Sequence, residues 1–293
     1  MMQAVLQTTE QPVAAVQPVD APLTFIVPQD TMPYFLSSAS TGGDPEVHFK
    51  TEDHTVTIND MRASAENLSI ESQGFELRRH ETAVADLYDD DAIASVYNPE
   101  IEALLKQATG VDRVAIFDHT RRSDSAGGAA NPGGQRGPAS RVHVDYTVKS
   151  GPVRAGDALG YDEVARILGN GGRIAQINVW RPIKGPVRRT PLALADARSI
   201  GPDELVATEQ VFPDRVGEIY QLAHGDGQRW YWASDMKPDE VILIKGWDSL
   251  DDGRAQFTPH GAFALPGQDP EAPPRESIET RTYVVFEGLD QTA

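Results

Sequence analysis

Residues 141–147, Arg-Val-His-Val-Asp-Tyr-Thr, contain the pair of side chains best suited to chemistry in this 293-residue chain. Apolar and polar residues alternate along them, which predicts a β-strand with two different faces. His143 and Asp145 then share one face, as an imidazole beside a carboxylate. Such a pair can supply two ligands to one metal ion.

A third ligand must come from elsewhere in the chain. His260, in the sequence Thr-Pro-His-Gly (258–261), is the candidate. Two His residues and one carboxylate on one side of an ion leave its other positions open, which is the arrangement in non-haem Fe(II) oxygenases. His143 and His260 are far apart in the sequence, so folding must bring them together.

The spacing alone is a weak signal. With 7 His and 44 acidic residues, about one His should precede an acid by two places through chance alone. A second pair, His224 and Asp226, does fit the same spacing. It lies in Ala-His-Gly-Asp-Gly (223–227), which is typical of a tight turn and less suited to aligning two side chains. The alternating strand therefore favours His143 and Asp145.

The composition restricts the partners. A net charge of −18 would repel a phosphate backbone or an anionic bilayer, which argues against nucleic acid and membranes. The sequence has no apolar run long enough to span a bilayer, and residues 1–20 lack the features of a secretory signal. There is no Cys, so thiolate chemistry is excluded. We expect a cytoplasmic protein that binds small molecules, and the sequence leaves a homo-oligomer open.

Strand signals outnumber helix signals along the chain. Helices are predicted at residues 89–97, at 99–109, where Asn98 and Pro99 provide a start, and at 161–168. Short apolar or alternating segments recur from residue 111 to residue 286. This pattern predicts a β-rich α+β fold, with a double-stranded β-helix (jelly-roll or cupin-like) core and flanking helices. We expect residues 1–22 to form a mobile tail and residues 23–293 a single domain.

Residues 123–140 are mostly Gly, Ala, Pro and Ser, which predicts a flexible loop. A Gly-rich loop can bind phosphate, but here no Lys-Ser/Thr pair follows and no helix begins. The loop leads directly into the strand of His143, so a lid over the site is a hypothesis. Equal protease sensitivity of the loop with and without ligand would contradict it.

Several motifs in a fixed order resemble the CmcJ/AsaB-like family of secondary metabolism. They cover roughly the C-terminal 60% of the chain, more than a usual small domain. The motifs are Phe117-Asp-His-Thr-Arg121, Val142-His-Val-Asp-Tyr-Thr147, Asn178-Val-Trp-Arg-Pro182, Gly185-Pro-Val187, Pro191-Leu-Ala-Leu194, Pro238-Asp-Glu-Val-Ile-Leu-Ile-Lys245 with Asp248-Ser249, Pro259-His260, and Ala272-Pro-Pro-Arg-Glu-Ser-Ile-Glu279. The order of these motifs is far more specific than the His-x-Asp pair.

The resemblance implies a non-haem Fe(II)/2-oxoglutarate-dependent oxygenase with a jelly-roll barrel. It implies that His143, Asp145 and His260 are the iron ligands and the catalytic centre. It also implies a cosubstrate site in which the Arg275 guanidinium binds the distal carboxylate of 2-oxoglutarate through two hydrogen bonds, and the Ser277 hydroxyl adds another.

Weaker candidates accompany these residues. Arg281 lies on the same predicted strand as Arg275 and is the second candidate for the carboxylate. Asn178 and Arg181 lie on one strand with Trp180, and we expect them to face the pocket, whereas Trp180 itself is expected in the core. The sequence has Gly261 where the family pattern has Thr or Ser after Pro-His, which we expect to alter the pocket wall near the iron.

The implied reaction consumes 2-oxoglutarate and O2, forms succinate and CO2, and oxidises a C–H bond of a small secondary metabolite. Hydroxylation, desaturation, ring closure and peroxidation remain open, since the positioning of the substrate decides among them. A cupin-like metal-dependent lyase or isomerase is the alternative, and product formation without O2 would favour it. A non-catalytic binding protein is the third hypothesis, and ligand binding without iron would favour it.

Overall fold

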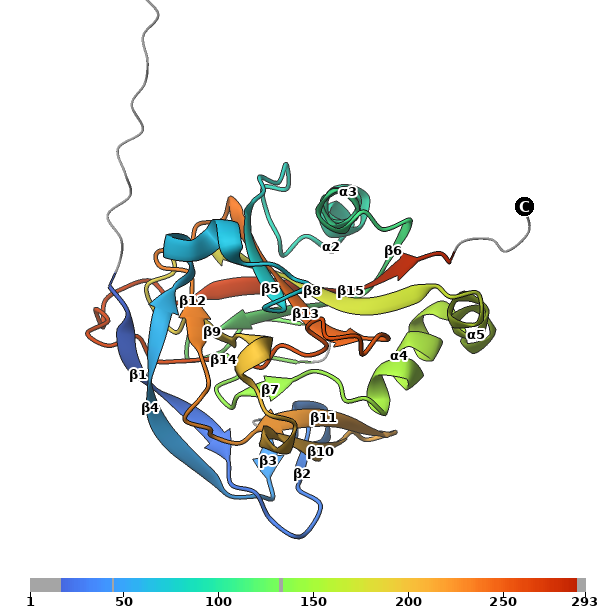
Figure 1. Ribbon diagram of the computed structural model, residues 1–293. Helices are drawn as coiled ribbons and strands as arrows, with labels where there is room; N and C mark the ends of the chain where they lie inside the picture. Colours follow the sequence, from blue (N-terminus) through green and yellow to red (C-terminus); the bar gives the residue numbers. More distant parts are fainter. Residues whose placement is uncertain (1–16, 44, 132–133, 289–293) are drawn as a thin grey trace, which may run out of the picture.

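The computed structural model describes residues 17–43, 45–131 and 134–288, which form two β-sheets (Figure 1). The smaller sheet has five strands in the order β5-β13-β8-β15-β6, and every neighbouring pair is antiparallel. Its strands are β5 (Phe75–Arg79), β6 (Arg113–Ser123), β8 (Arg173–Lys184), β13 (Glu240–Asp248) and β15 (Glu276–Phe286).

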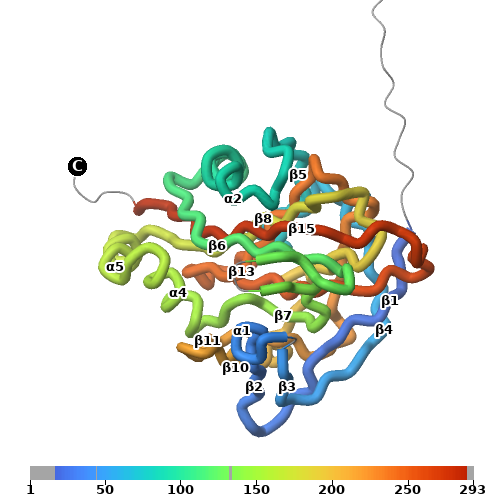
Figure 2. Tube along the Cα trace, turned by 180° about the vertical axis from the view of Figure 1, so that it is seen from behind, coloured from blue at the N-terminus to red at the C-terminus, as the bar shows by residue number. Residues whose placement is uncertain are grey.

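The larger sheet has ten strands in the order β1-β4-β12-β9-β14-β7-β11-β10-β2-β3. It curls beneath the smaller sheet, so that the two sheets face one another (Figures 1 and 2). Its strands are β1 (Val19–Ile26), β2 (Tyr34–Leu36), β3 (Glu46–Val47), β4 (Thr51–Asp60), β7 (His143–Val144), β9 (Leu192–Ala195), β10 (Leu205–Val211), β11 (Val216–Leu222), β12 (Trp230–Trp232) and β14 (His260–Ala262).

This arrangement confirms the predicted jelly-roll core with flanking helices. In Figure 1, α2 and α3 lie on the side of the smaller sheet that faces away from the larger one, and α4 and α5 lie at one end. The helices are α1 (Ser38–Thr41), α2 (Asp90–Ala92), α3 (Asn98–Thr109), α4 (Ser150–Leu159) and α5 (Tyr161–Gly169), with short helical turns at Met61–Asn67, Ile93–Tyr97, Ala197–Ser199 and Pro202–Glu204.

The two faces of the smaller sheet serve different purposes. Its outer face packs against α3, through Ile177 and Val179 of β8 and Ile101 of α3 in one apolar cluster. The inner face lies toward the larger sheet. Along each strand, successive side chains point alternately to the outer and the inner face. Trp180 and Glu279 therefore point between the sheets, where residues of the larger sheet meet them.

The N-terminal boundary differs from the prediction. Strand β1 begins at Val19 and pairs with β4 up to Ile26, so residues 19–22 belong to the sheet. The composition of residues 1–22, which lacks a clear period, suggested a tail. However, β1 is the first strand of the larger sheet, and an edge strand tolerates Pro22, which has no N–H donor. Residues 1–16 of the predicted tail lie outside the described residues.

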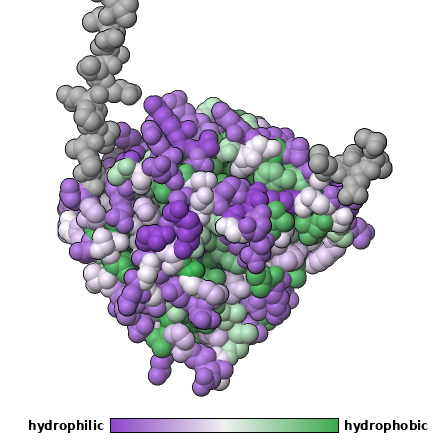
Figure 3. Space-filling model, in the orientation of Figure 1, coloured by the Kyte–Doolittle hydropathy of each residue, from purple (hydrophilic) through white to green (hydrophobic). Residues whose placement is uncertain are grey.

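The exterior agrees with the charged composition. Hydrophilic residues cover most of the face seen in Figure 3, with apolar residues scattered among them. None of the described helices combines the length and the apolar composition needed to cross a membrane.

Candidate functional site

Two short neighbouring strands place the two imidazoles. Strand β7 pairs antiparallel with β14, and His143 lies directly opposite His260. Residues directly opposite in an antiparallel pair project from the same face. The predicted strand over residues 141–147 is thus confined to His143 and Val144, and Asp145 follows at its end. Val142 and Val144 are fully buried on the other face, which anchors this segment.

The three predicted ligands meet at one point. One ligand atom from each of His143, Asp145 and His260 lies within 4.8 Å of the others. Asp145 Oδ1 is 3.8 Å from His143 Nε2, and the two imidazole rings are 4.7 Å apart between centroids. Within the described parts of the chain, no other group of three His, Cys, Asp or Glu residues comes together in this way. The rival His224 instead stacks on His54.

The hydrogen bonds of the imidazoles leave the correct nitrogens free for a metal. His143 Nδ1 is 2.9 Å from the main-chain oxygen of Arg141, and His260 Nδ1 is 3.0 Å from that of Thr258. A carbonyl oxygen only accepts, so each Nδ1 must carry the proton and donate it. Each Nε2 therefore presents a lone pair toward Asp145, as in metal sites whose ligands are oriented by outer hydrogen bonds.

The charge state also suits a metal. Burial lowers the pKa of His143 to about 3, and the adjacent His260 adds to this effect, so the imidazole is neutral at physiological pH. Burial opposes ionisation of Asp145, but the charge of Arg281, the hydrogen bond from Asn178 and the other neighbouring groups together outweigh it, so the pKa of Asp145 is lowered. A neutral imidazole at His143 and an ionised carboxylate at Asp145 are protonation states that coordination requires.

Asn178 contacts the carboxylate ligand rather than the cavity. Its Nδ2 donates to Asp145 Oδ2 at 2.6 Å, and its own Oδ1 accepts from Gln176 Nε2 at 2.5 Å. Because Oδ2 is occupied, Oδ1 is the oxygen left for a metal. Gln176 is fully buried, and its side chain fills the space where a side chain at Gly246 would be. A chain of two amides thus fixes Asp145.

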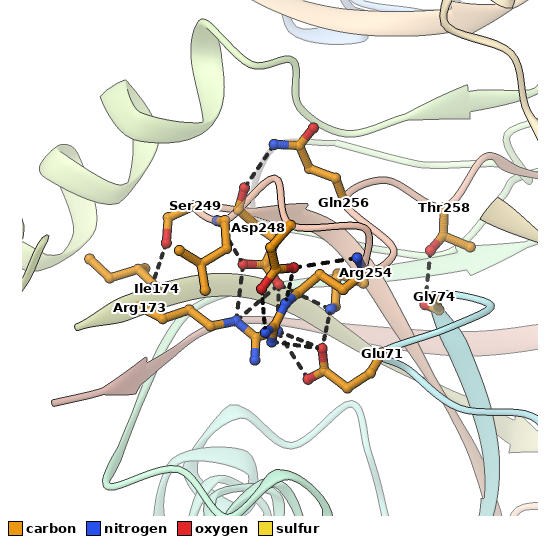
Figure 4. Close-up of polar contacts among 12 residues, drawn as sticks. Glu71, Gly74, Arg173, Ile174, Asp248, Ser249, Arg254, Gln256 and Thr258 are labelled. Carbon is orange, nitrogen blue, oxygen red and sulfur yellow. Dashed lines mark hydrogen bonds and ion pairs between the residues drawn. The ribbon is translucent and has the colours of Figure 1, made fainter. Parts of the chain in front are cut away.

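A second set of buried charges supports the segment that carries His260 (Figure 4). Arg173 Nε and Lys245 Nζ both donate to Asp248 at 3.0 Å, and both cations also contact Glu71. A β-bulge at Gly246 places Lys245 and Asp248 on the same, outer face of β13.

Glu71 further contacts Arg254, which pairs with Asp252. We call these six residues the outer charge cluster. Beside it, Thr258 Oγ1 donates to the Gly74 carbonyl at 2.8 Å, two residues before His260. The cluster therefore fixes the loop between β13 and β14.

A cavity between the sheets adjoins the two His residues. It encloses about 330 Å³ of space, part of which is open to solvent. Both sheets contribute to its walls, which consist of Arg122, Ala139, His143, Trp180, Leu192, His260, Ala262, Arg275, Glu279 and Arg281.

Arg275 and Ser277 lie on the inner side of the smaller sheet, and both are almost fully buried. The Arg275 guanidinium lies 5.7 Å from the centre of the Trp180 ring, and its Nη1 donates to the Thr190 carbonyl at 2.8 Å. Its Nε has no hydrogen-bond partner among the described residues. Burial, with the charge of Arg122, lowers the pKa of Arg275 to about 9. An anion in the cavity would reverse this penalty.

Arg281 also lines the cavity, but its guanidinium is already paired. Its Nε donates to Glu279 at 3.0 Å and its Nη1 to Asp118 at 3.0 Å, and Asp145 lies 4.0 Å from its Nη2. Burial alone would lower the pKa of Arg281, yet these carboxylates raise it. Arg281 is thus placed to balance the carboxylates beside the His residues.

Arg181 does not reach the cavity. It is an odd number of residues from Trp180 and Asn178 along β8, so its side chain lies on the outer face. There its Nη1 donates to the main-chain oxygens of His80 and Pro238, and its Nε to the Tyr97 hydroxyl. The expectation that Arg181 faces the pocket is wrong, because successive side chains of a strand point to opposite faces and Trp180 takes the inner one.

Gly261 faces away from the cavity. A side chain there would contact the main chain of Ser140, Arg141 and Val142, at 3.3 to 3.4 Å. The absence of a side chain therefore lets β14 approach residues 140–142, and the pocket wall is formed by its neighbours His260 and Ala262. The expected alteration of the wall is not what this glycine produces.

Three residues of the site were missed by the sequence reasoning. Arg122 and Glu279 line the cavity, and Gln176 orients Asn178. Arg122 directly follows the motif of residues 117–121, and Glu279 precedes Arg281 by two places. The period of a strand was therefore the signal for both, because inward residues recur at every second position.

Comparisons with known proteins point to one group. Residues 23–285 match a family described as "Oxidoreductase/YMDC permease-like domain". The chain is 31% identical to the hydroxylase/desaturase efuI of Hormonema carpetanum, over 89% of this chain and 96% of that protein. It is 33% identical to the alpha-ketoglutarate-dependent dioxygenase tstK of Talaromyces stipitatus, over 83% and 90%.

A solved structure is also similar. The iron and alpha-ketoglutarate-dependent endoperoxidase NvfI, which shares its name with a dioxygenase of Aspergillus novofumigatus, superimposes with a TM-score of 0.80. The superposition covers 92% of this chain and 99% of that chain, at 28% identity.

Proposed function

The chain belongs to the CmcJ/AsaB-like family of non-haem Fe(II)/2-oxoglutarate-dependent oxygenases, and on that premise we propose that His143, Asp145 and His260 bind its iron. We further propose that Arg275 and Ser277 bind the distal carboxylate of 2-oxoglutarate. The substrate is proposed to be a small secondary metabolite with a C–H bond to be oxidised, in a cytoplasmic setting without nucleic acid or membrane.

One observation carries the proposal. Two imidazoles have their Nδ1 protons fixed by main-chain carbonyls, and their Nε2 atoms converge with Asp145 Oδ1. Two neutral His and one carboxylate on one side of an ion are the donor set of the facial triad, so the residues present fit Fe(II). The unpartnered Nε of Arg275 in the same cavity supports a carboxylate ligand.

The protein's own contribution is binding and orientation. When bound, Fe(II) with 2-oxoglutarate and O2 supplies an oxidant that removes hydrogen from carbon, while 2-oxoglutarate becomes succinate and CO2. Asn178 holds Asp145 so that a single carboxylate oxygen faces the metal. Trp180 and Leu192 give the cavity apolar walls, which exclude water around the reacting groups.

An absorption titration tests this proposal. Anaerobic apo-protein receives Fe(II) and then 2-oxoglutarate, and we expect a visible metal-to-ligand charge-transfer band. The band should be absent in His143→Ala and should need a higher 2-oxoglutarate concentration in Arg275→Ala. A folded wild-type protein without a band would contradict the proposed ligands.

Product analysis separates this function from the lyase or isomerase alternative. We expect succinate to form from 2-oxoglutarate only in the presence of O2 and to disappear when any of the three ligands is replaced by Ala. The relatives are named as dioxygenases and hydroxylase/desaturases, which does not favour the alternative. Turnover retained in all three Ala variants would contradict the proposed roles.

A further inference from the structure

Arg122 is a second cavity arginine whose charge the proposed function leaves unused. Building on that function, we propose that Arg122 binds the distal carboxylate of 2-oxoglutarate together with Arg275. The carboxylate would then lie between guanidinium groups from two neighbouring strands, with Ser277 between them. Arg122 would thus be a cosubstrate-binding residue rather than a surface cation.

The register of the smaller sheet places Arg122 beside the proposed site. Strand β6 pairs antiparallel with β15, and Arg122 lies directly opposite Ser277. The two side chains therefore share the inner face, one strand spacing apart. Arg275 is two residues from Ser277, on the same face, and both arginines line the cavity.

Among the described residues, the hydrogen bonds of Arg122 leave most of its donors free. Its Nη1 donates to the Gly137 carbonyl at 2.9 Å. Throughout residues 17–43, 45–131 and 134–288, neither Arg122 nor Arg275 forms an ion pair, whereas Arg281 pairs with both Asp118 and Glu279. A guanidinium has five N–H donors, so two cations with vacant donors face one cavity.

In the part of the chain that the structure describes, the nearby carboxylates form no ion pair with Arg122 or Arg275 and are bonded to other groups. Asp124 accepts from the main-chain N–H of Arg275 and the hydroxyl of Thr190, and it pairs with Arg189 at 3.2 Å. Glu279 accepts from Arg281 at 3.0 Å. Both acids are therefore already bonded to other groups.

The charge balance favours the cosubstrate over an anionic substrate. Three guanidiniums and one carboxylate line the cavity, so two positive charges lack a counterpart there. 2-Oxoglutarate is a dianion and supplies both negative charges. The charge of Fe(II) would in turn be matched by Asp145 and Asp118, which flank Arg281. Among the residues that line the cavity, no further arginine then remains for a second anion.

Paired ligands test the proposal. 2-Oxopentanoate carries the same keto acid as 2-oxoglutarate but a methyl group in place of the distal carboxylate. Dissociation constants of both ligands are measured from the charge-transfer band of the anaerobic, Fe(II)-loaded full-length protein. The variants are Arg122→Gln, Arg275→Gln, Arg122→Lys and the control Arg215→Gln, which removes an exposed arginine beyond β10.

We expect Arg122→Gln and Arg275→Gln each to weaken the binding of 2-oxoglutarate about 10- to 100-fold, as for a lost charge-assisted hydrogen bond. Binding of Fe(II) and 2-oxopentanoate should change less than about twofold, because neither involves the distal carboxylate. Arg122→Lys should recover part of the affinity, and Arg215→Gln should match the wild type.

Three results would overturn the proposal. Unchanged 2-oxoglutarate affinity in folded Arg122→Gln would assign this residue to the substrate or to structure. Equal loss of Fe(II) or 2-oxopentanoate binding would show that Arg122 supports the iron ligands instead. Unfolding of both Arg122 variants would make it structural. Absence of any band in the wild type would instead refute the proposed function, a separate outcome.

Discussion

The smaller sheet has a cluster of charged residues beside each of its faces, and the two clusters differ in how their charges are balanced. On the outer face, the three cations Arg173, Lys245 and Arg254 form ion pairs with the three acids of the outer charge cluster, and some of these acids are shared between cations. On the inner face, Arg122, Arg275 and Arg281 share the cavity with one carboxylate, that of Glu279. We call these three residues the inner arginine group.

This difference distinguishes buried charges that stabilise the fold from buried charges that bind a ligand. Lys245 and Asp248 are completely buried, as a functional pair could be, yet each finds its charge partner inside the protein. Arg275 is just as buried, but its partner is missing. Burial of charge therefore does not mark a binding site, whereas an unbalanced charge facing a cavity does.

The largest effect should come from breaking the balanced cluster. Asp248→Asn leaves Arg173 and Lys245 without their common buried acceptor. We expect the free energy of unfolding to fall by about 3–5 kcal/mol, as for a buried pair that loses one partner. Denaturant unfolding of the apo-protein measures it.

Glu71→Gln provides the matched control within the same cluster. The Glu71 side chain is 40% exposed, so water can replace the lost ion pairs and the change should stay below about 1 kcal/mol. Equal losses in the Asp248 and Glu71 variants would show that burial does not determine the strength of this cluster.

The opposite sign is expected for the inner arginine group. Arg275→Met removes a buried cation without an acidic partner, so the apo-protein should gain stability, within the range of about 1–4 kcal/mol found when buried charges become apolar. The same variant should bind 2-oxoglutarate poorly. Thermal unfolding with and without Fe(II) and 2-oxoglutarate measures both effects.

A loss of stability in apo Arg275→Met would mean that this arginine supports the fold. The comparison between balanced and unbalanced clusters would then no longer distinguish the two faces.

The smallest effect concerns acid. Burial lowers the pKa of His143 from 6.5 to about 3, so the unfolded chain binds a proton in this interval that the folded apo-protein does not. The free energy of unfolding should therefore decrease as pH falls below 6.5, by at most about 1.4 kcal/mol per pH unit from this group. Between pH 6 and 4.5, apo His143→Gln should lose this part of the slope.

Urea titrations at several pH values would measure that slope, with His54→Gln as a control on a partly exposed imidazole. A slope in His143→Gln equal to that of the wild type would contradict the assignment to His143.

Three features could be read from the sequence: the alternation of the strands, the order of the motifs and the residue types of the ligands. The jelly-roll core and the three residues that meet at one point were therefore predictable. Helix α4 was not, because Gly151 and Gly156 are poor helix formers. Both are required by close packing: a Cβ at either position would lie 2.5 Å from an aromatic ring, of Trp247 or Tyr161. Tertiary contacts outweighed local propensity there.

The pairing of the charged residues could not be predicted from the sequence either. The partners of Arg281 come from its own strand and from β6, and one of the two partners of Lys245, Glu71, comes from a loop far away in the chain. Which arginine keeps vacant donors depends on these long-range contacts. Alternation could have assigned Arg181 to the outer face and Arg122 to the inner one, but not their pairing.

The shortness of β7 and β14 has a consequence for the register at the centre of the larger sheet. These strands have two and three residues, and they meet through one paired position, His143 with His260. A shift of one residue would turn His260 to the opposite face and bring Gly261 to the cavity, at the cost of few hydrogen bonds. Only the correct alignment presents two imidazoles to one ion. Metal binding would therefore stabilise the correct register of β7 and β14 over a shifted one.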